Sequence, residues 1–237
     1  MTEATVLSWP VPGPYVVAFS TRNGGSSDGP FASLNLGRKT GDSVERVDEN
    51  RRRLCTAVGA DYRQLALGFQ HHSSTVNRAR AGIRGTPGDG LWSEEPGVPM
   101  LALAADCAPI AIARGPGRRP ALAVVHAGRI GLLGGVVETA VAAIGPSSSA
   151  VIGPAIGPCC YEVGPEVSGP FRARFGTDVV RGRKLDIWTA AERALREAGV
   201  ARVERADLCT ACHPELFFSH RRDGATRGVH GVIGYVA

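Results

Sequence analysis

Apolar and polar positions along the chain follow two periods, one typical of strands and one typical of helices. Apolar, β-rich runs predict strands at 15–20, 121–126 and 231–237, and a strand followed by a turn at 150–157. Helical spacing of apolar residues predicts helices at 41–59, 131–145 and 185–200. Strands and helices are therefore mixed throughout the chain, which predicts an α/β or α+β fold.

Two of the expected helices show which side should face the core. In the helix at 41–59, Asp42 and Glu45 have the spacing of a capping box. The residues expected on its inner face are Val44, Val47, Leu54 and Ala57. The helix at 185–200 is strongly amphipathic and ends at Gly199. Its inner face is expected to hold Leu185, Trp188, Leu195 and Ala198.

The apolar run LALAADCAPIAIA at 101–113 contains an acid and a thiol side by side, Asp106 and Cys107. Apart from these two residues the pattern predicts a buried strand pair, or a strand with a turn. Whether the two side chains have a chemical role depends on which other residues of the chain meet them.

Composition limits the class of protein. The 237 residues are 43% hydrophobic, enough for a sizeable core, and no linker or repeat divides them, so residues 1–237 are expected to form a single domain. The N-terminus has Glu3 and no basic residue, unlike a signal peptide, and no apolar run reaches the ~18 residues of a membrane span. We therefore expect a cytoplasmic protein with no membrane partner. Its six cysteines are expected to be thiols or metal ligands rather than disulfides.

The formal net charge is +5, but the chain has no Lys/Arg tract of the kind that binds nucleic acid. No nucleic-acid partner is therefore expected. Nearly all of the basic residues are arginines, which suit bidentate contact with phosphate or carboxylate. The run Arg51–Arg53 lies within a helical pattern and is expected to form a solvated face of that helix.

Candidate catalytic residues lie at the ends of three separate predicted strands. His126 ends a strand and precedes a glycine turn and a helix, whose N-terminus favours anions. His71 and His72 follow the short run LALGFQ, and Cys107 lies in the run at 101–113. One Cys and two His could make a three-ligand zinc site with an open fourth position, as in catalytic zinc sites. The spacing alone equally allows Cys107 as a small buried hydrophobe and His126 as a hydrogen-bonded core residue.

The remaining motifs are weaker. Cys209 and Cys212 form a Cys-x-x-Cys pair with no second pair at zinc-finger spacing, and the adjacent Cys159 and Cys160 are not expected to bind one ion easily. The glycine-rich stretch RNGGSSDG at 22–29 lacks the Lys of a P-loop, so it is either a surface loop or part of a ligand site. The chain has no G-x-S-x-G elbow and no G-x-G-x-x-G after a strand.

Several segments together resemble one known family. They are FSTRNGGSSDGPFASLNLG, QHHSSTV, ADCAP, HAGRIGLLGG, IGPAIGPCCYEVGPEV, LDIWTAA and CT…FFSHRRDG, in the family's order from about Phe19 to Gly224. This is the multi-copper polyphenol oxidoreductase (laccase-like) domain family, whose bacterial and human members are purine nucleoside phosphorylases. The resemblance implies a four-layer α/β/β/α sandwich, similar to the catalytic domain of cytotoxic necrotizing factor toxins.

The resemblance also implies a site. Its zinc ligands correspond here to His72, Cys107 and His126, with His71 outside the set. Asp106 would lie beside the ion and orient its water or exchange protons with it, so that Asp106, Cys107 and His126 are the expected catalytic residues. The residues expected around ribose or phosphate are Arg22, Asn35 and Arg51.

The implied activity is zinc-dependent phosphorolysis of adenosine, inosine, guanosine and methylthioadenosine, together with deamination of adenosine. Two segments depart from the family pattern. Arg129 and Ile130 stand where the family usually has Trp and Arg, and Arg227 and Gly228 stand in reversed order. Because these positions are close to the expected anion site, we expect phosphorolysis to be the weaker activity. Purine nucleosides and phosphate are thus the expected partners, and the oligomeric state, monomer or small homo-oligomer, is left open.

Two other functions remain compatible with the sequence. One is an amide hydrolase that edits cell-wall precursors, with Cys107 as nucleophile and His126 as base. The other is a nucleotide-binding module without catalysis. A true multi-copper laccase is not expected, because six scattered histidines do not supply both a blue-copper site and a histidine-rich oxygen-reducing cluster.

Overall fold

The computed structural model describes residues 3–237. The strands of its two large sheets are β1 (Val6–Ser8), β2 (Tyr15–Ser20), β3 (Ala66–Phe69), β4 (Val76–Arg78), β5 (Arg84–Pro87), β6 (Gly90–Ser93), β7 (Met100–Ala104), β8 (Ala108–Arg114), β9 (Leu122–Ala127), β10 (Ser147–Ile152), β13 (Arg202–Arg205) and β14 (His230–Val236). A small hairpin is formed by β11 (Val180–Arg181) and β12 (Lys184–Leu185). The α-helices are α1 (Val44–Ala57), α2 (Arg129–Leu133), α3 (Val136–Ile144), α4 (Pro165–Phe175), α5 (Ile187–Glu197) and α6 (His220–Asp223).

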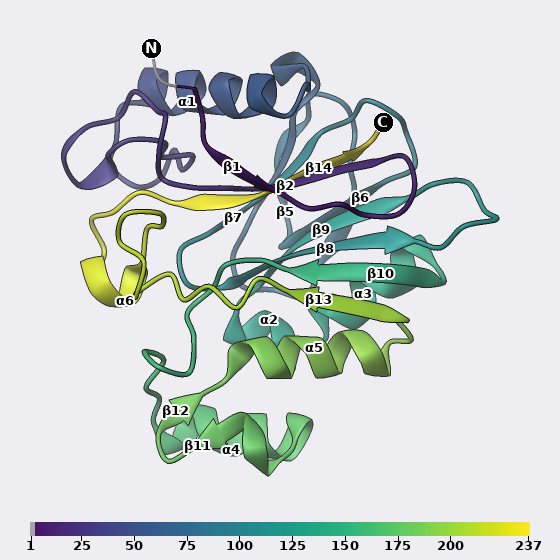
Figure 1. Ribbon diagram of the computed structural model, residues 1–237, viewed down its shortest axis with the longest axis vertical. Helices are drawn as coiled ribbons and strands as arrows, with labels where there is room; N and C mark the ends of the chain where they lie inside the picture. The colour runs from purple at the N-terminus through teal and green to yellow at the C-terminus, as the bar shows by residue number, and fades with distance from the viewer. Residues whose placement is uncertain (1–2) are drawn as a thin grey trace.

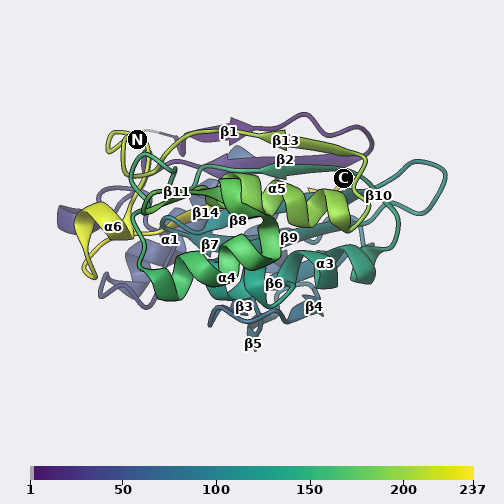
Figure 2. The same ribbon diagram turned by 90° about the horizontal axis from the view of Figure 1, so that it is seen from below.

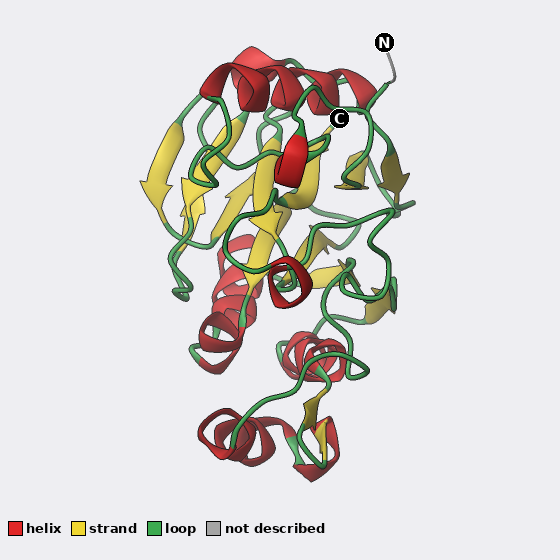
Figure 3. Ribbon diagram, turned by 90° about the vertical axis from the view of Figure 1, so that its left-hand side faces the viewer, coloured by secondary structure: helices red, strands yellow, loops and turns green. Residues whose placement is uncertain are grey.

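The two sheets lie face to face between layers of helices. The first sheet has the strand order β1-β2-β14-β7-β3-β5, and the second has the order β13-β10-β8-β9-β6-β4. Helix α1 lies above the first sheet, and α2, α3 and α5 lie below the second (Figure 1). Figure 2 shows α3, α4 and α5 across the second sheet from below, and Figure 3 shows the layers from the side. The four-layer α/β/β/α fold implied by the resemblance is confirmed.

Alternating burial along the central strands holds these layers together, because successive side chains of a strand point to opposite faces. In β8, Ile110 packs against the helices and Ala111 packs into the space between the two sheets. In β7, Met100 lies between the sheets and Leu101 packs under α1. The core is therefore divided into three apolar layers, and the polar site residues lie at strand ends rather than within them.

Most of the predicted elements are confirmed, with β2, β9, β10 and β14 at the predicted strands. The predicted helix at 131–145 is instead two helices, α2 and α3, which are separated by Gly134 and Gly135. Gly135 has a φ of 83°, a left-handed conformation that glycine adopts without steric cost and that interrupts the helix. No helix within residues 3–237 has the length and apolar character needed to cross a bilayer.

Helix α1 corrects three details of the sequence analysis. Its N-cap is Ser43, whose side chain accepts the backbone N–H of Arg46, so the capping box of Asp42 and Glu45 is wrong. Asp42 instead accepts hydrogen bonds from the side chains of Ser27 and Asn35. On the inner face, Val47 and Leu54 are buried as predicted, whereas Val44 and Ala57 are exposed. The other buried positions are Asn50, Arg51 and Cys55, so part of the inner face is polar or charged.

The run at 101–113 forms two strands that do not pair with each other. Strand β7 belongs to the first sheet and β8 to the second, so the chain crosses from one sheet to the other at residues 105–107. Asp106 and Cys107 lie on this crossing, which explains why an acid and a thiol interrupt an otherwise apolar run.

Candidate active site

The three residues expected to bind zinc lie together at one end of the sandwich. The ligating atoms of His72, Cys107 and His126 are all within 4.8 Å of one another. The Sγ of Cys107 is 3.8 Å from Nε2 of His72, and the two imidazole rings meet edge to face with centroids 4.9 Å apart. The three side chains come from three different strand ends: His72 follows β3, Cys107 precedes β8 and His126 lies near the end of β9.

The loop that carries His72 is fixed by a side-chain amide. Gln70 accepts the backbone N–H of Leu103 and donates to the carbonyl of the same residue, both at 2.7 Å, so its side chain extends the pairing between β3 and β7. His72 itself has a φ of 63°, a left-handed conformation that is uncommon for a residue with a side chain. Such a conformation persists only where the surrounding contacts determine it. His71 points its Nδ1 to the carbonyl of Phe69, 3.1 Å away, and lies outside the cluster.

Cys107 approaches His72 closely because of a glycine. A Cβ atom at Gly128 would come within 2.8 Å of Cδ2 of His72 and 3.1 Å of Sγ of Cys107, so any larger residue would push the ligands apart. The preceding Asp106 has a φ of 93°, a second left-handed residue beside the site. The glycine of the segment HAG is therefore a requirement of the site geometry rather than of the turn alone.

Asp89 connects two of the candidate ligands and was not predicted from the sequence. Its Oδ1 is 2.8 Å from Nδ1 of His126, and its carboxylate also accepts the backbone N–H groups of His71, His72 and Ser73. A carboxylate on Nδ1 fixes the ring tautomer and leaves Nε2 free to bind metal. The one signal in the sequence is an acid between two glycines, directly before the strand β6.

The charges in the cluster favour a thiolate. Burial opposes ionisation of Cys107, but the charge and hydrogen bonds of His126 and His72 outweigh burial and lower the thiol pKa to about 6. Burial alone would lower the pKa of His126, whereas Cys107 and Asp89 raise it to about 9. For Asp89 itself, burial is outweighed by hydrogen bonds from His126 and Ser73, which hold its pKa far below the usual value. Thiolate is the form of cysteine that binds metal or attacks a substrate.

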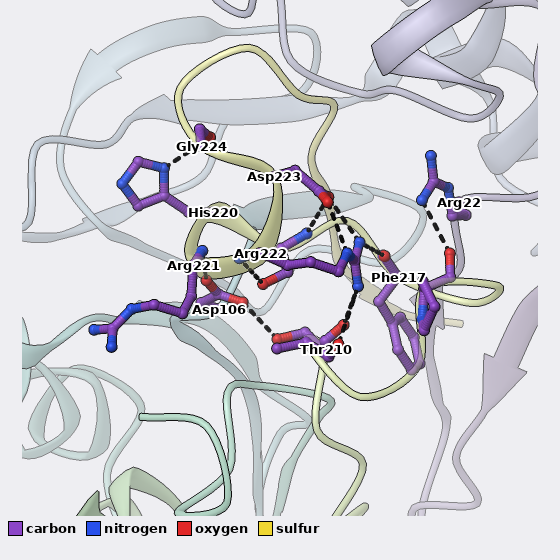
Figure 4. A network of polar contacts seen from close by, with 12 residues as sticks. Arg22, Asp106, Thr210, Phe217, His220, Arg221, Arg222, Asp223 and Gly224 are labelled. Carbon is purple, nitrogen blue, oxygen red and sulfur yellow. Dashed lines mark hydrogen bonds and ion pairs between the residues drawn. The ribbon is translucent and has the colours of Figure 1, made fainter. Parts of the chain in front are cut away.

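Asp106 is held by the C-terminal segment of the chain. Its Oδ1 accepts the hydroxyl of Thr210 and its Oδ2 accepts the backbone N–H of Arg221, both at 2.6 Å (Figure 4). Its carboxylate is buried, and it lies beside Cys107 on the wall of the cavity described below. Each oxygen has a further lone pair, so the carboxylate can still accept a proton or a hydrogen bond.

The three candidate ligands open onto a large, positively charged cavity of about 890 Å³. Apart from the ligands, its polar wall contains seven basic residues and one acid, Asp106. The basic residues are Arg38, Lys39, Arg51, Arg84, Arg129, Arg221 and Arg227. A cavity with this excess of positive charge attracts anions, and arginine suits phosphate in particular.

The residues expected to bind ribose or phosphate occupy different positions. Arg51 lines the cavity and is only 2% exposed, which corrects the expectation of a solvated helix face. Burial and the nearby Arg38 lower its pKa to about 10, and its Nε donates to the carbonyl of Leu36. Asn35 is fully buried and does not line the cavity; it bonds Thr40, Asp42 and the backbone of Val229.

Arg22 also lies off the cavity wall. Its guanidinium donates to the carbonyls of Ala32 and Pro214 and lies over the ring of Phe218, so it joins an N-terminal loop to the C-terminal segment (Figure 4). Arg22 and Asn35 thus shape the segments around the cavity, while Arg51 reaches its interior.

The two departures from the family pattern also differ in position. Arg129 lines the cavity, whereas the side chain of Ile130 is 58% exposed and is not part of the wall. Arg227 lines the cavity as well, and its Nε is buried with no hydrogen-bond partner among the described residues. An unpartnered buried donor on a cavity wall is a place for a ligand oxygen.

The donor set fits a metal ion. Two imidazoles and a low-pKa thiolate are ligands that Zn²⁺ prefers, and three protein ligands leave a fourth position for water or substrate. Because the three residues line the cavity, the open position would face a ligand bound there. His72, Cys107 and His126 would hold the ion, and Asp89 would orient His126 behind it.

Comparison with known proteins identifies the same family as the sequence motifs. A family model described as multi-copper polyphenol oxidoreductase laccase matches residues 16–235. Purine nucleoside phosphorylase YfiH of Escherichia coli is 34% identical over 235 residues, which cover 95% of this chain and 96% of that protein. Purine nucleoside phosphorylase PA4543 of Pseudomonas aeruginosa is 37% identical over 229 residues, 92% of each chain. The chain belongs to the multi-copper polyphenol oxidoreductase (laccase-like) family.

Solved structures of similar proteins agree with this membership. Protein NMB0706 of Neisseria meningitidis superposes with a TM-score of 0.88 at 32% identity and covers 99% of both chains. YlmD of Geobacillus stearothermophilus superposes with a TM-score of 0.86 at 32% identity, over 96% of this chain and 94% of that one. The laccase-like domain therefore extends over nearly all of the chain.

Proposed function

We propose that the chain is a zinc-dependent purine nucleoside phosphorylase that also deaminates adenosine. The observation that carries the proposal is the position of the His72–Cys107–His126 cluster on the wall of a cavity lined by seven basic residues. Phosphorolysis needs an anion beside a nucleoside, and the cavity offers both the charge and the volume. The relatives named purine nucleoside phosphorylase support the same reaction class.

Phosphate would bind among the arginines of the cavity. Arg51 is buried and Arg227 is half-buried. Charge-assisted hydrogen bonds made away from solvent are stronger than those made in water. In phosphorolysis a phosphate oxygen forms a bond to the anomeric carbon of ribose while the bond from that carbon to the purine nitrogen breaks. Cations that hold the phosphate close to that carbon reduce the entropic cost of bringing the two reactants together.

The purine and ribose would lie between the anion site and the cluster. Apolar and aromatic residues of the cavity offer a surface for the base, namely Leu67, Phe69, Ile156, Tyr161 and Ile187. Burial and the negative charge of Cys107 raise the pKa of Tyr161, so its phenol keeps its proton and remains a hydrogen-bond donor. Adenosine, inosine, guanosine and methylthioadenosine share the purine and ribose that this surface would contact.

Deamination would use the same cavity without phosphate. His72, Cys107 and His126 would hold a zinc ion, whose chemistry there would be to lower the pKa of water, so that the water could attack the purine carbon that carries the amino group. Asp106 would accept a proton from the attacking water and pass a proton to the departing amino group, and Asp89 would keep His126 in its metal-binding tautomer. Ammonia leaves as the new carbon–oxygen bond forms.

The test is to assay purified protein of known zinc content with inosine and adenosine, with and without phosphate. We expect release of hypoxanthine from inosine only when phosphate is present, and release of ammonia from adenosine in either condition. Addition of a chelator should remove both activities, and zinc should restore them. Zinc-loaded protein that binds adenosine but turns over neither substrate would contradict the proposal and favour a nucleotide-binding module.

One observation favours a second candidate, a cysteine hydrolase. Cys107, His126 and Asp89 form a thiolate, an imidazolium and an orienting carboxylate in the order that nucleophilic catalysis requires. The same thiolate cannot serve fully as both metal ligand and nucleophile. Metal-free protein that cleaves an amide substrate and is inactivated by iodoacetamide at Cys107 would favour this function, whereas tight zinc binding at Cys107 would exclude it.

A further inference from the structure

Four cysteines that lie outside the catalytic cluster converge at one place. The Sγ atoms of Cys159, Cys160, Cys209 and Cys212 are all within 4.8 Å of one another. Cys212 lies 3.5 Å from Cys159 and 3.4 Å from Cys160, measured between Sγ atoms. With zinc–sulfur bonds of about 2.3 Å, the sulfur atoms of a tetrahedral site are about 3.8 Å apart. The group therefore has the dimensions of a site for one ion.

The local backbone explains how adjacent cysteines contribute to one group. Residues 158–160 form a turn, in which the backbone N–H groups of Cys160 and Tyr161 both donate to the carbonyl of Gly157. In a strand, successive side chains point to opposite faces, but in a helical turn they differ by about 100°. Both thiols can therefore reach the same side, contrary to the expectation that adjacent cysteines do not easily bind one ion.

The second pair is shaped in a way that suits thiolate ligands. The Sγ of Cys209 accepts the backbone N–H of Gly157 at 3.2 Å, and the carbonyl of Cys209 accepts the N–H groups of Cys212 and His213. A backbone N–H that donates to the sulfur favours the thiolate, which is the form of cysteine that binds metal. Arg222 donates to the carbonyl of Thr210 and pairs with Asp223, so it ties the Cys-x-x-Cys loop to the helix α6.

The separations of the sulfur atoms fit neither free thiolates nor disulfide bonds. Several thiolates at this separation repel one another, and a divalent cation between them removes that repulsion. The sulfur distances of 3.4 and 3.5 Å are also well beyond the ~2.05 Å of a disulfide bond.

We propose that Cys159, Cys160, Cys209 and Cys212 form a second, structural zinc site with four thiolate ligands. It would join the loop at 157–163 to the segment at 206–224, two parts of the chain that both supply walls of the cavity. Tyr161 comes from the first and Arg221 from the second. Thr210, next to Cys209, bonds Asp106 in the active site. The site thus fixes the C-terminal segment against the catalytic cluster without touching substrate.

Metal content tests the proposal independently of activity. Protein purified under reducing conditions should contain two zinc ions per chain, Cys107→Ala should contain one, and Cys209→Ser/Cys212→Ser should also contain one. The exposed Cys159→Ser offers a milder change, and it should lower zinc affinity even if the double variant does not fold. Cys55→Ala is the matched control, because Cys55 is buried outside both clusters, and its zinc content should equal that of the wild type.

A spectroscopic measurement identifies the ligands. Cobalt(II) added to metal-free Cys107→Ala should give the intense thiolate-to-metal charge-transfer bands of a tetrahedral sulfur site, and Cys159→Ser in that background should weaken them. Wild-type zinc content retained in Cys209→Ser/Cys212→Ser, or a Cys107→Ala protein without zinc, would overturn the proposal. So would mass spectrometry showing these cysteines as disulfides in protein purified under reducing conditions. Wild-type protein that binds two zinc ions but shows neither purine activity would contradict the proposed function and still support the second zinc site.

Discussion

The two clusters of metal-binding side chains differ in how completely their donors surround an ion. The cluster of His72, Cys107 and His126 comes from three strand ends and opens onto the cavity, with Asp89 behind one ligand. The four cysteines come from two loops and offer four ligands of one kind. Three mixed ligands leave a position for chemistry, whereas four thiolates fill a tetrahedron and leave none. The comparison separates a site built for reaction from one suited to hold the chain together.

Removing the thiolate ligand of the open cluster should have the largest effect on zinc binding and activity. Cys107→Ala deletes one of three ligands, so we expect loss of the catalytic zinc and of both purine activities. The ligands come from separate elements that are already packed, so the circular dichroism spectrum should remain that of the wild type. Metal analysis and assays on the same preparation check this. A Cys107→Ala protein that is active and still contains two zinc ions would remove the distinction between the two clusters.

Weakening the support of the open cluster should have a smaller effect. Asp89→Asn keeps the shape of the side chain but removes the charge that orients His126, and we expect zinc affinity at the open cluster to fall by about 10- to 100-fold. Titration against a chelator of known affinity measures this. His71→Ala is the control, because its ring lies beside the same loop but outside the cluster. Equal losses in the two variants would mean that loop stability, and not orientation of His126, sets the affinity.

Substitutions in the cavity wall should affect phosphorolysis more than deamination. Arg51→Ala should raise the phosphate KM or lower kcat/KM for phosphorolysis by ~10- to 200-fold, which is the ~1.5–3 kcal/mol of a charge-assisted hydrogen bond. Adenosine deamination should change much less, because it needs no phosphate. Arg52→Ala, on the exposed side of the same helix, serves as control. Unchanged phosphorolysis in Arg51→Ala would limit Arg51 to its contact with the carbonyl of Leu36.

The smallest effect is expected at Ile130. From the sequence, this departure from the family pattern predicts weaker phosphorolysis, which Ile130→Arg should restore. Because Ile130 is exposed and Arg129 already lines the cavity, we now expect Ile130→Arg to change either rate by less than about twofold, as for most surface substitutions. Steady-state kinetics with inosine and adenosine decide this. A large gain in phosphorolysis would show that position 130 reaches bound phosphate.

The sequence was informative where a motif has a fixed register. In the segment QHHSSTV the family resemblance selected His72 over His71, and the strand runs located β2, β9, β10 and β14. It was uninformative where function depends on residues brought together by the fold. Asp89 lies 37 positions from the histidine that it orients, and Cys159 lies 53 positions from Cys212. Neither pair has a local pattern, because their contacts exist only after two sheets and two loops have packed.

Because the chain crosses between the sheets at residues 105–107, metal binding at the open cluster also bears on the stability of the fold. His72 follows a strand of the first sheet, His126 belongs to the second, and Cys107 lies where the chain passes between them. An ion bound there would link the two sheets, so separation of the sheets during unfolding would require release of the ion. Binding to the folded form alone adds ~2.7 kcal/mol of stability at a free ion concentration of 100 times Kd. For a chain of this length that raises the Tm by roughly 5–10 °C, so thermal unfolding reports how fully the open cluster is loaded.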